Sequence, residues 1–475
     1  MGRGRLVLAR AAGVAVTPAL AAAEVAASPA GTSAGPFLAG VPVDFLLFAL
    51  TLAGVAMFHR YALQVALAGL AFIAAWKLGF SPFKEGAGLP GLAAHFRHEA
   101  VLLANLFGLL VGFAVLARHF EKTRIPSLLP HHLPRGWPGA FAMLVIVFVL
   151  SSFLDNIAAA MIGGTMAYTV FRARVHVGYL AAIVAAANAG GAGSVVGDTT
   201  TTMMWIDHVA PSDVVRAYVA AVVALVVCGI PAAMQQHRHS PLHREPAGKI
   251  GVDWVRLAIV FAILIAAVAV NVVVNTRFPE HADAAPWLAL AVWGAILLTA
   301  LIRRPDWDVL RDASLGALFL IALVSAASMM PVEQLPPASW PTALALGFVS
   351  AVFDNIPLTE LALKQGGYDW GFLAFAVGFG GSMLWFGSSA GVALASLFPQ
   401  ARSAGRWLVD GWHVAVAYVV GFFFMLAVLG WHPTPKQVRL QPAIATTAAI
   451  RDAAPQDWKR SLSRRANASL TIAAA

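Results

Sequence analysis

Long apolar runs alternate along the chain with short polar loops. A bilayer core about 30 Å thick needs roughly 20 mostly apolar residues per helix, and about ten segments meet this requirement. Several are apolar on every side, which excludes barrel strands, because those would alternate polar and apolar residues. The pattern therefore predicts an all-α polytopic membrane protein. The expected spans are residues 43–57, 61–79, 99–117, 176–208, 213–233, 255–275, 286–302, 313–330, 370–398 and 413–431.

Two further apolar segments, residues 139–171 and 341–366, carry the tripeptide Asp-Asn-Ile near the middle. The arm of the first segment that ends at Leu154 would be about 24 Å long as a helix, which is shorter than the hydrocarbon layer. We therefore expect each segment to enter the membrane and turn back as a re-entrant hairpin, in addition to the ten spans.

The two hairpins begin two similar halves. Aligning Asp155 with Asp354 pairs Asn156 with Asn355, and each half then carries GG-x5-G followed by a hydroxyl cluster. Glycine pairs let a helix unwind and free its backbone carbonyls for an ion or ligand. Opposite hairpin openings make the halves inverted repeats, and interrupted helices at matching positions point to a transport site at the midplane. The glycines of the breaks are Gly190, Gly191, Gly197, Gly380, Gly381 and Gly387.

These elements predict an order of domains along the chain. The N-terminus, with a basic start and a short apolar stretch, resembles a cleavable bacterial signal peptide. The expected domains are a leader (1–30), N-terminal scaffold helices (40–95), a first repeat (96–235) with hairpin 139–171 and broken helix 176–208, a basic loop (236–256), linking helices (257–302), a second repeat (303–431) with hairpin 341–366 and broken helix 370–398, and a basic tail (432–475).

The charges indicate orientation rather than a nucleic-acid partner. The net charge is +9, but Lys and Arg are spread over short loops and the tail. By the positive-inside rule the basic loops are cytoplasmic, which places both mature termini in the periplasm of a protein of the bacterial inner membrane. The single cysteine, Cys228, lies in an apolar span, so an intrachain disulfide is excluded.

Aspartates in three apolar or glycine-rich segments carry the candidate chemistry. Asp155 and Asp354 could serve only as helix N-caps, but neutral Ser or Asn would cap nearly as well, and an intramembrane carboxylate costs several kcal/mol. Oxygen ligands suit a hard cation. Some of the hydroxyls would only satisfy backbone groups, and Asn188 could bond across helices. The candidate ligands are Asp155, Asn156, Asn188, Asp198, Thr199, Thr200, Thr201, Asp354, Asn355, Ser388 and Ser389, with Glu360 as a further carboxylate.

The segments "FLDNIAAAM", "NAGGAGSVVGDTTTTMMW", "VFDNIPL" and "GGSMLWFGSSAGVA" resemble the signature segments of NhaD-type sodium/proton antiporters. These belong to the ion transporter superfamily, which also holds arsenite exporters and citrate and dicarboxylate carriers. The resemblance implies two inverted repeats, a homodimer assembled through a scaffold, and a transport domain that slides against it. In the dicarboxylate carriers the hairpin tips read Ser-Asn-Thr, whereas Asp replaces that Ser here.

The resulting hypothesis is a transporter, not an enzyme, that exchanges Na⁺ or Li⁺ for protons in the lipid bilayer without a cofactor. Asp155, Asp198 and Asp354 would hold the ion when deprotonated and carry protons on the return. Two alternatives stay open: a citrate, dicarboxylate or arsenite carrier of the same superfamily, and an intramembrane protease with two aspartates. The protease would leave the paired helix breaks unexplained.

Overall fold

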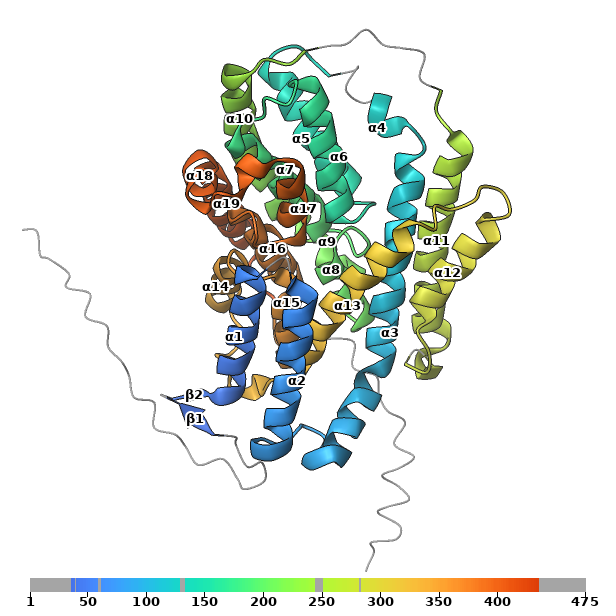
Figure 1. Ribbon diagram of the computed structural model, residues 1–475, viewed down its shortest axis with the longest axis vertical. Coiled ribbons are helices and arrows are strands. Elements are labelled where there is room, and N and C mark those ends of the chain that lie inside the picture. Colours follow the sequence, from blue (N-terminus) through green and yellow to red (C-terminus); the bar gives the residue numbers. More distant parts are fainter. Residues whose placement is uncertain are drawn as a thin grey trace, which may run out of the picture.

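The computed structural model describes residues 36–38, 40–58, 61–128, 133–243, 251–281 and 283–434. The described part is almost entirely helical, with one short hairpin of β1 and β2 near its beginning (Figure 1). The expected leader (1–30) and the tail beyond residue 434 lie outside the described residues, so the predictions for both stay untested.

The helices of the first half of the chain follow the hydrophobic runs closely. The elements are β1 (Phe37–Leu38), β2 (Val41–Pro42), α1 (Val43–Met57), α2 (Ala62–Phe80), α3 (Gly88–Glu121), α4 (Ile125–Leu128), α5 (Trp137–Ser151), α6 (Asn156–Val170), α7 (Val177–Ala192), α8 (Thr199–Ile206), α9 (Pro211–Val215) and α10 (Tyr218–His239).

The second half begins after a polar loop. Its elements are α11 (Trp254–Arg277), η3 (Pro279–His281), α12 (Trp287–Thr299), α13 (Val309–Ser328), η4 (Val332–Gln334), α14 (Trp340–Ser350), α15 (Asn355–Gln365), α16 (Trp370–Gly380), η5 (Gly381–Met383), α17 (Ser389–Leu397), η6 (Pro399–Arg402), α18 (Ala404–Asp410) and α19 (Trp412–Leu429).

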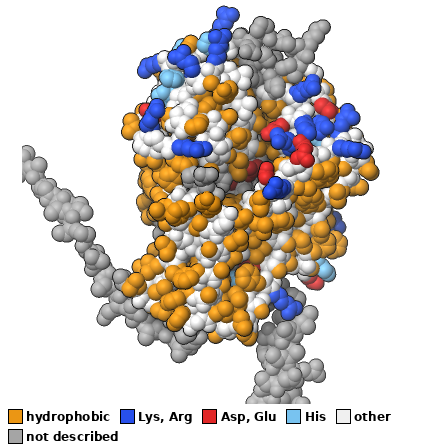
Figure 2. Space-filling model, in the orientation of Figure 1, with side chains coloured by type: hydrophobic (Ala, Val, Ile, Leu, Met, Phe, Trp, Pro, Cys, Tyr) orange, Lys and Arg blue, Asp and Glu red, His pale blue; other side chains and the backbone are white. Residues whose placement is uncertain are grey.

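The protein is a mostly helical, polytopic membrane protein. Six helical segments within the described residues are long and apolar enough to cross a bilayer: Ala62–Phe80, Gly88–Glu121, Pro211–His239, Trp254–Val274, Val309–Ser328 and Trp412–Leu429. Further apolar helices, such as α5 and α7, are shorter. Hydrophobic side chains cover most of the middle and lower surface, while Lys and Arg gather toward the upper end (Figure 2). Such a surface suits a hydrocarbon environment with polar ends.

The boundary that we expected at residues 95–96 falls inside a helix. α3 is continuous from Gly88 to Glu121, so the scaffold and the first repeat are not separated there. The expected span at 99–117 began eleven residues after the observed start of the helix at Gly88. The polar residues of this region are helical because His95 and Glu99 are buried and hydrogen-bonded to other helices, which offsets the cost of taking them out of water.

Both expected broken helices are interrupted. α7 and α8 are separated by residues 193–198, and α16 and α17 by residues 381–388, which include the short turn η5. Gly190 lies against the carbonyl oxygen of Phe148 in α5, and Gly380 lies against that of Gly347 in α14. A β-carbon at either position would overlap the neighbouring backbone, so only glycine allows these close approaches.

The basic loops lie together at one end of the molecule. The Asp253 amide donates to the Thr123 carbonyl (3.1 Å), Lys122 pairs with Asp306 (2.8 Å), and the His243 amide donates to the Val170 carbonyl (3.0 Å). We call the segments 118–124, 170–176, 238–243 and 303–311, which are helix ends and the loops that join them, the basic end. At the opposite end Thr434 donates to Asp213 (2.9 Å), so the chain leaves α19 away from the basic loops.

Candidate functional site

The two Asp-Asn-Ile tips have the same local geometry. Asp155 caps α6 with φ −52° and ψ 141°, and Asp354 caps α15 with φ −54° and ψ 138°. Each carboxylate accepts from the amide two residues later, at 3.1 Å from Ile157 and 3.0 Å from Ile356. Both aspartates therefore are N-caps, as one interpretation of the sequence held. Capping engages one oxygen of each carboxylate, and in Asp354 the other accepts from the Ser389 hydroxyl (3.2 Å).

A second pair of caps follows the helix breaks. Asp198 begins α8 with φ −144° and ψ 143°, and Ser388 begins α17 with φ −142° and ψ 152°. Asp198 is almost fully buried, and its Oδ2 accepts from the Thr200 hydroxyl at 2.7 Å. Asp198 and Ser388 thus have the same backbone conformation at corresponding positions of the two halves, but only Asp198, in the first half, carries a charge.

Asn188 of α7 connects the two halves. Its side-chain nitrogen donates to the Ser382 hydroxyl (2.9 Å) and to the Ser388 hydroxyl (3.2 Å). Its side-chain oxygen accepts from Asn156 (3.0 Å), which also donates to Asp198 (3.2 Å). One chain of hydrogen bonds therefore runs from the acidic break of the first half to the hydroxyl break of the second. Since Asn188 is fully buried, this bridge is shielded from competing water.

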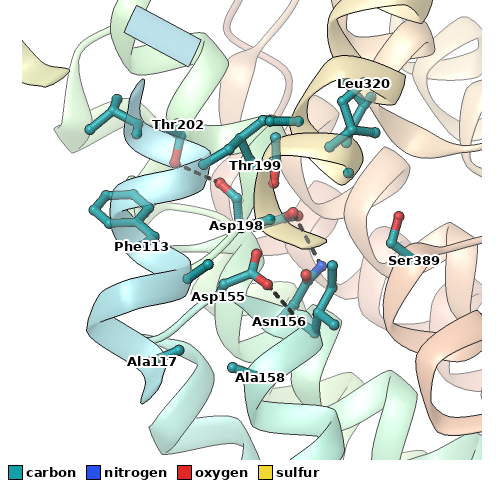
Figure 3. Close-up of a pocket in the computed structure, with 18 of the residues that line it drawn as sticks. Phe113, Ala117, Asp155, Asn156, Ala158, Asp198, Thr199, Thr202, Leu320 and Ser389 are labelled. Carbon is teal, nitrogen blue, oxygen red and sulfur yellow. Dashed lines mark hydrogen bonds between the residues drawn. The ribbon is translucent and has the colours of Figure 1, made fainter. Parts of the chain in front are cut away.

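A cavity of about 510 Å³ opens beside these residues (Figure 3). Asp155, Asn156 and Asp198 lie together on one wall, and Ser389 comes from the second half. Apolar residues of α3 and α13, including Phe113 and Leu320, also line the cavity. The lining then continues through Arg118, Glu121 and Asp312 to the basic end, so the cavity joins the site to that end of the molecule. Further polar lining residues are Thr199, Thr202 and Asn355.

Three further predicted residues, Thr201, Asp354 and Glu360, do not line this cavity. Thr201 donates to the carbonyl oxygens of Ser194 (2.5 Å) and Asp198 (2.9 Å), so its hydroxyl satisfies the broken backbone. Asp354 lies behind Ser389 and is not among the lining residues. Glu360 lies at a distance from the cavity lining and is fully buried, with its Oε1 3.6 Å from Lys364.

Within the described residues, no three His, Cys, Asp or Glu side chains form a cluster that could hold a metal ion. Asp155 and Asp198 line the cavity, whereas Asp354 stands with Ser389 in the second half. The expectation that Asp155, Asp198 and Asp354 share one ion stays a prediction. Oxygen atoms of Asn, Ser and Thr side chains also line the cavity or its edge.

Ser382 is a site residue that the sequence reasoning missed. It is fully buried at the start of the second break and accepts from Asn188. Only the alignment of the two halves could have indicated Ser382: it has a hydroxyl directly after Gly381, whereas the matching residue after Gly191 is Ala192. Thr202 lines the cavity, and its hydroxyl donates to the Val195 and Asp198 carbonyls, both at 2.9 Å.

Comparison with known proteins identifies the family. Residues 39–367 match the family described as citrate transporter. The chain belongs to this family. It is 25% identical over 340 residues to sodium/proton antiporter 1 of Arabidopsis thaliana, which covers 63% of this chain and 58% of that protein. The chain therefore spans less than two thirds of that relative.

Two bacterial sodium/proton antiporters are also similar to this chain. The Na⁺/H⁺ antiporter NhaD of Vibrio parahaemolyticus is 28% identical over 298 residues, covering 52% of this chain and 71% of that protein. The protein of the same name from Alkalimonas amylolytica is 25% identical over 397 residues, covering 71% and 79%. The predicted resemblance to NhaD-type members of the ion transporter superfamily is thus confirmed, and the chain is a multi-pass membrane protein that belongs to a family of transporters.

Proposed function

We propose that this transporter exchanges Na⁺, or Li⁺, for protons across the bacterial inner membrane by alternating access. The observation that carries the proposal is the placement of Asp155 and Asp198 on one wall of a cavity in an apolar helical protein. Carboxylates at such a position are costly unless they bind a cation or a proton, and a transporter alternates between the two. The names of the antiporter relatives support the same pair of ions.

Cation binding in this cavity would use oxygen atoms from both halves. Asp155, Asp198 and Thr199 line it from the first half, and Asn355 and Ser389 from the second. The Asn156 amide donates to Asp198 and Asn188 and so positions the carboxylate rather than binding the ion with its nitrogen. Carboxylate, amide and hydroxyl oxygens are the ligands that hard cations prefer. Asp354, which accepts from Ser389, is proposed as the third carboxylate of the exchange.

Competition for the same carboxylates couples the two fluxes. A carboxylate that holds sodium cannot be protonated, and a protonated carboxyl has lost the negative charge that attracts sodium. Each return of the empty site therefore requires a proton, which gives exchange instead of a leak. Two halves with matching caps at Asp155 and Asp354, inverted in the membrane as re-entrant hairpins, would present this site alternately to the two sides.

The conformation described here would face the cytoplasm. The cavity extends from the site to the basic end, and the positive-inside rule assigns basic loops to the cytoplasmic side. In this assignment the last described residues near Thr434, which lies beside Asp213, face the periplasm. The homodimer that the resemblance implies is retained as a prediction.

A citrate or dicarboxylate carrier is the second candidate, and the family match favours it. The charges of the cavity oppose it. Arg118 is the one basic residue among the described residues that line the cavity, and its guanidinium already pairs with Glu121 at 2.6 Å. Four acidic residues line the same cavity: Glu121, Asp155, Asp198 and Asp312. A multiply charged anion would meet repulsion at the site, whereas a monovalent cation would be attracted.

The test uses everted membrane vesicles loaded with a pH-sensitive dye and energised by respiration. Addition of NaCl or LiCl should raise the luminal pH when the wild-type protein is present. Asp155→Asn and Asp354→Asn should abolish this response, because asparagine keeps the N-cap but cannot carry a charge. Asp312→Asn is the matched control, since Asp312 lies exposed at the cavity mouth. It should keep most of the exchange.

Addition of citrate and KCl to the same vesicles separates the two candidates. No response to any cation, in vesicles shown to contain the protein, would overturn the antiporter proposal. Citrate uptake that depends on the same aspartates would then establish the anion carrier.

A further inference from the structure

A second cavity, of about 460 Å³, lies at the end of the molecule opposite the basic loops. Its lining includes Asp207, His208 and Asp283, which belong to loops at that end, and the last two are joined at 3.1 Å. α3 contributes Leu102 and Asn105, while the neighbouring residue Leu106 lines the first cavity. The two cavities therefore approach each other along α3.

Three helices pass from the first cavity to the second. α3 is one, and α8 lines the first with Thr202 and the second with Trp205. α15 lines the first with Asn355 and the second with Lys364. The residues that lie between on α8 and α15 include Met203, Met204, Thr359 and Glu360, all of which are buried. A layer of packed side chains thus separates the site from the second cavity.

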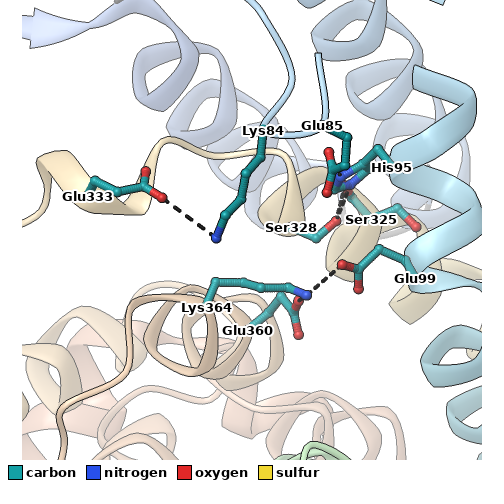
Figure 4. A network of polar contacts seen from close by, with 9 residues as sticks. All are labelled: Lys84, Glu85, His95, Glu99, Ser325, Ser328, Glu333, Glu360 and Lys364. Carbon is teal, nitrogen blue, oxygen red and sulfur yellow. Dashed lines mark hydrogen bonds and ion pairs between the residues drawn. The ribbon is translucent and has the colours of Figure 1, made fainter. Parts of the chain in front are cut away.

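Lys364 joins two of these helices at the wall of the second cavity, which both Lys364 and Glu99 line. Its ammonium lies 2.6 Å from the Glu99 carboxylate of α3 and 3.6 Å from the Glu360 carboxylate one turn earlier in α15 (Figure 4). Glu99 and Glu360 are 4% and 1% exposed at their side chains, so the three charges depend on one another for compensation. The contact between α3 and α15 is consequently electrostatic at this point.

The part of α3 that carries Glu99 is held in place by contacts of His95. His95, one turn before Glu99, contacts the Ser328 hydroxyl at the end of α13 (3.0 Å) and the Glu85 carboxylate (3.1 Å) (Figure 4). α3 and α13 also form the apolar wall of the first cavity. α15, in contrast, begins at the Asp354 tip and carries Asn355 of the site. The Lys364–Glu99 pair therefore connects a site-bearing helix to the wall against which the site opens.

We infer that the Lys364–Glu99 ion pair is a gate: by holding α15 against α3 it keeps the route from the transport site to the second cavity closed. Opening toward that cavity separates α15 from α3, and Lys364 then keeps Glu360, which lies on its own helix, as its remaining partner. Lys364 therefore keeps a carboxylate partner in both states, so the pair can break without leaving an isolated ammonium. This inference rests on the proposed alternating access, but its test measures accessibility and not ion flux.

The experiment places one reporter cysteine in the separating layer. Cys228, the single cysteine of the chain, is replaced by alanine, and Met203, which is 1% exposed, is replaced by cysteine. A membrane-impermeant maleimide is applied to each face of the membrane in turn. Glu99→Gln should speed labelling from the face of the second cavity on the order of tenfold, because loss of one charged contact shifts the population toward the open state.

Glu333→Gln is the matched control. It removes the same charge from an ion pair at the same end, with Lys84 at 3.8 Å, but both partners are exposed and lie away from the layer. Labelling should stay at the wild-type rate. Lys364→Arg keeps one cation between the same two carboxylates, Glu99 and Glu360, and should label at that rate. This variant distinguishes the gate from a general loosening of the fold.

Equal labelling rates in Glu99→Gln and Glu333→Gln would overturn the gate. So would fast labelling in Lys364→Arg, because that variant keeps the charge and the result would indicate damage to packing. If labelling changes as expected but vesicles show no cation/proton exchange, the gate stands and the proposed ions are wrong. If exchange is present and labelling does not change, the proposed function stands and the gate is wrong.

Discussion

The carboxylate of Asp198 lies against Gly378 of α16: a β-carbon at that glycine would stand 3.3 Å from Asp198 Oδ2. In the alignment of the halves Gly378 corresponds to Asn188, and the Asn188 amide contacts Ser388, the counterpart of Asp198. Each cap thus faces the broken helix of the other half. The carboxylate of Asp198 faces Gly378, whereas the hydroxyl of Ser388 faces the side-chain amide of Asn188. The single extra charge of the first half has space because the second half has no side chain there.

Gly378→Ala should therefore weaken exchange while leaving the protein folded. The new methyl group is too close to Asp198, and this carboxylate cannot move freely because Thr200 and Asn156 hold it. We expect a loss of about tenfold in sodium-dependent exchange, equivalent to about 1.4 kcal/mol. Gly294→Ala is the control, because a β-carbon at Gly294 meets nothing within 4 Å. Equal activity of the two variants would show that Asp198 tolerates displacement.

Lowering the pH should raise the sodium concentration that gives half-maximal exchange. Protons and sodium compete for Asp155 and Asp198 in the proposed mechanism, and a lower pH increases the protonated fraction that sodium must displace. For one-for-one competition the increase reaches about tenfold per pH unit in the acidic range. Saturating sodium should restore the same maximal rate. The measurement is a sodium titration of vesicle exchange at several pH values, and a half-maximal concentration independent of pH would contradict shared binding.

Asp369→Ala should destabilise the protein without removing a residue of the site. The Asp369 side chain is fully buried, pairs with Arg216 at 3.2 Å, and accepts from the amides of Gly371 and His432. Breaking a buried ion pair on one side leaves the other charge uncompensated, at a cost of about 3 kcal/mol. A thermal melt of detergent-solubilised protein measures the loss. Asp312→Ala, which changes an exposed residue, should have the same melting temperature as the wild type.

Much of the secondary structure follows from local pattern. The span expected at 43–57 coincides with α1, and the interruptions in 176–208 and 370–398 appear where the glycine pairs are. Apolar length and glycine content act over one or two helical turns, so neighbouring residues contain the information. The same reasoning failed at the start of α3, because the polar residues His95 and Glu99 are stabilised there by partners far away in the chain.

The sequence by itself determined the class of the protein, the two acidic tips, the helix breaks and the oxygen-rich chemistry. These depend on residue type and on spacing within single segments. Only the tertiary structure decided that Asn188 reaches Ser382, that Asp198 lies against Gly378 and that Lys364 pairs with Glu99. The two residues of these pairs lie up to 265 positions apart in the sequence. The physical reason is that such contacts arise when helices of the two halves pack together, and a hydrophobic pattern defines which faces are buried but not which distant side chain each will meet.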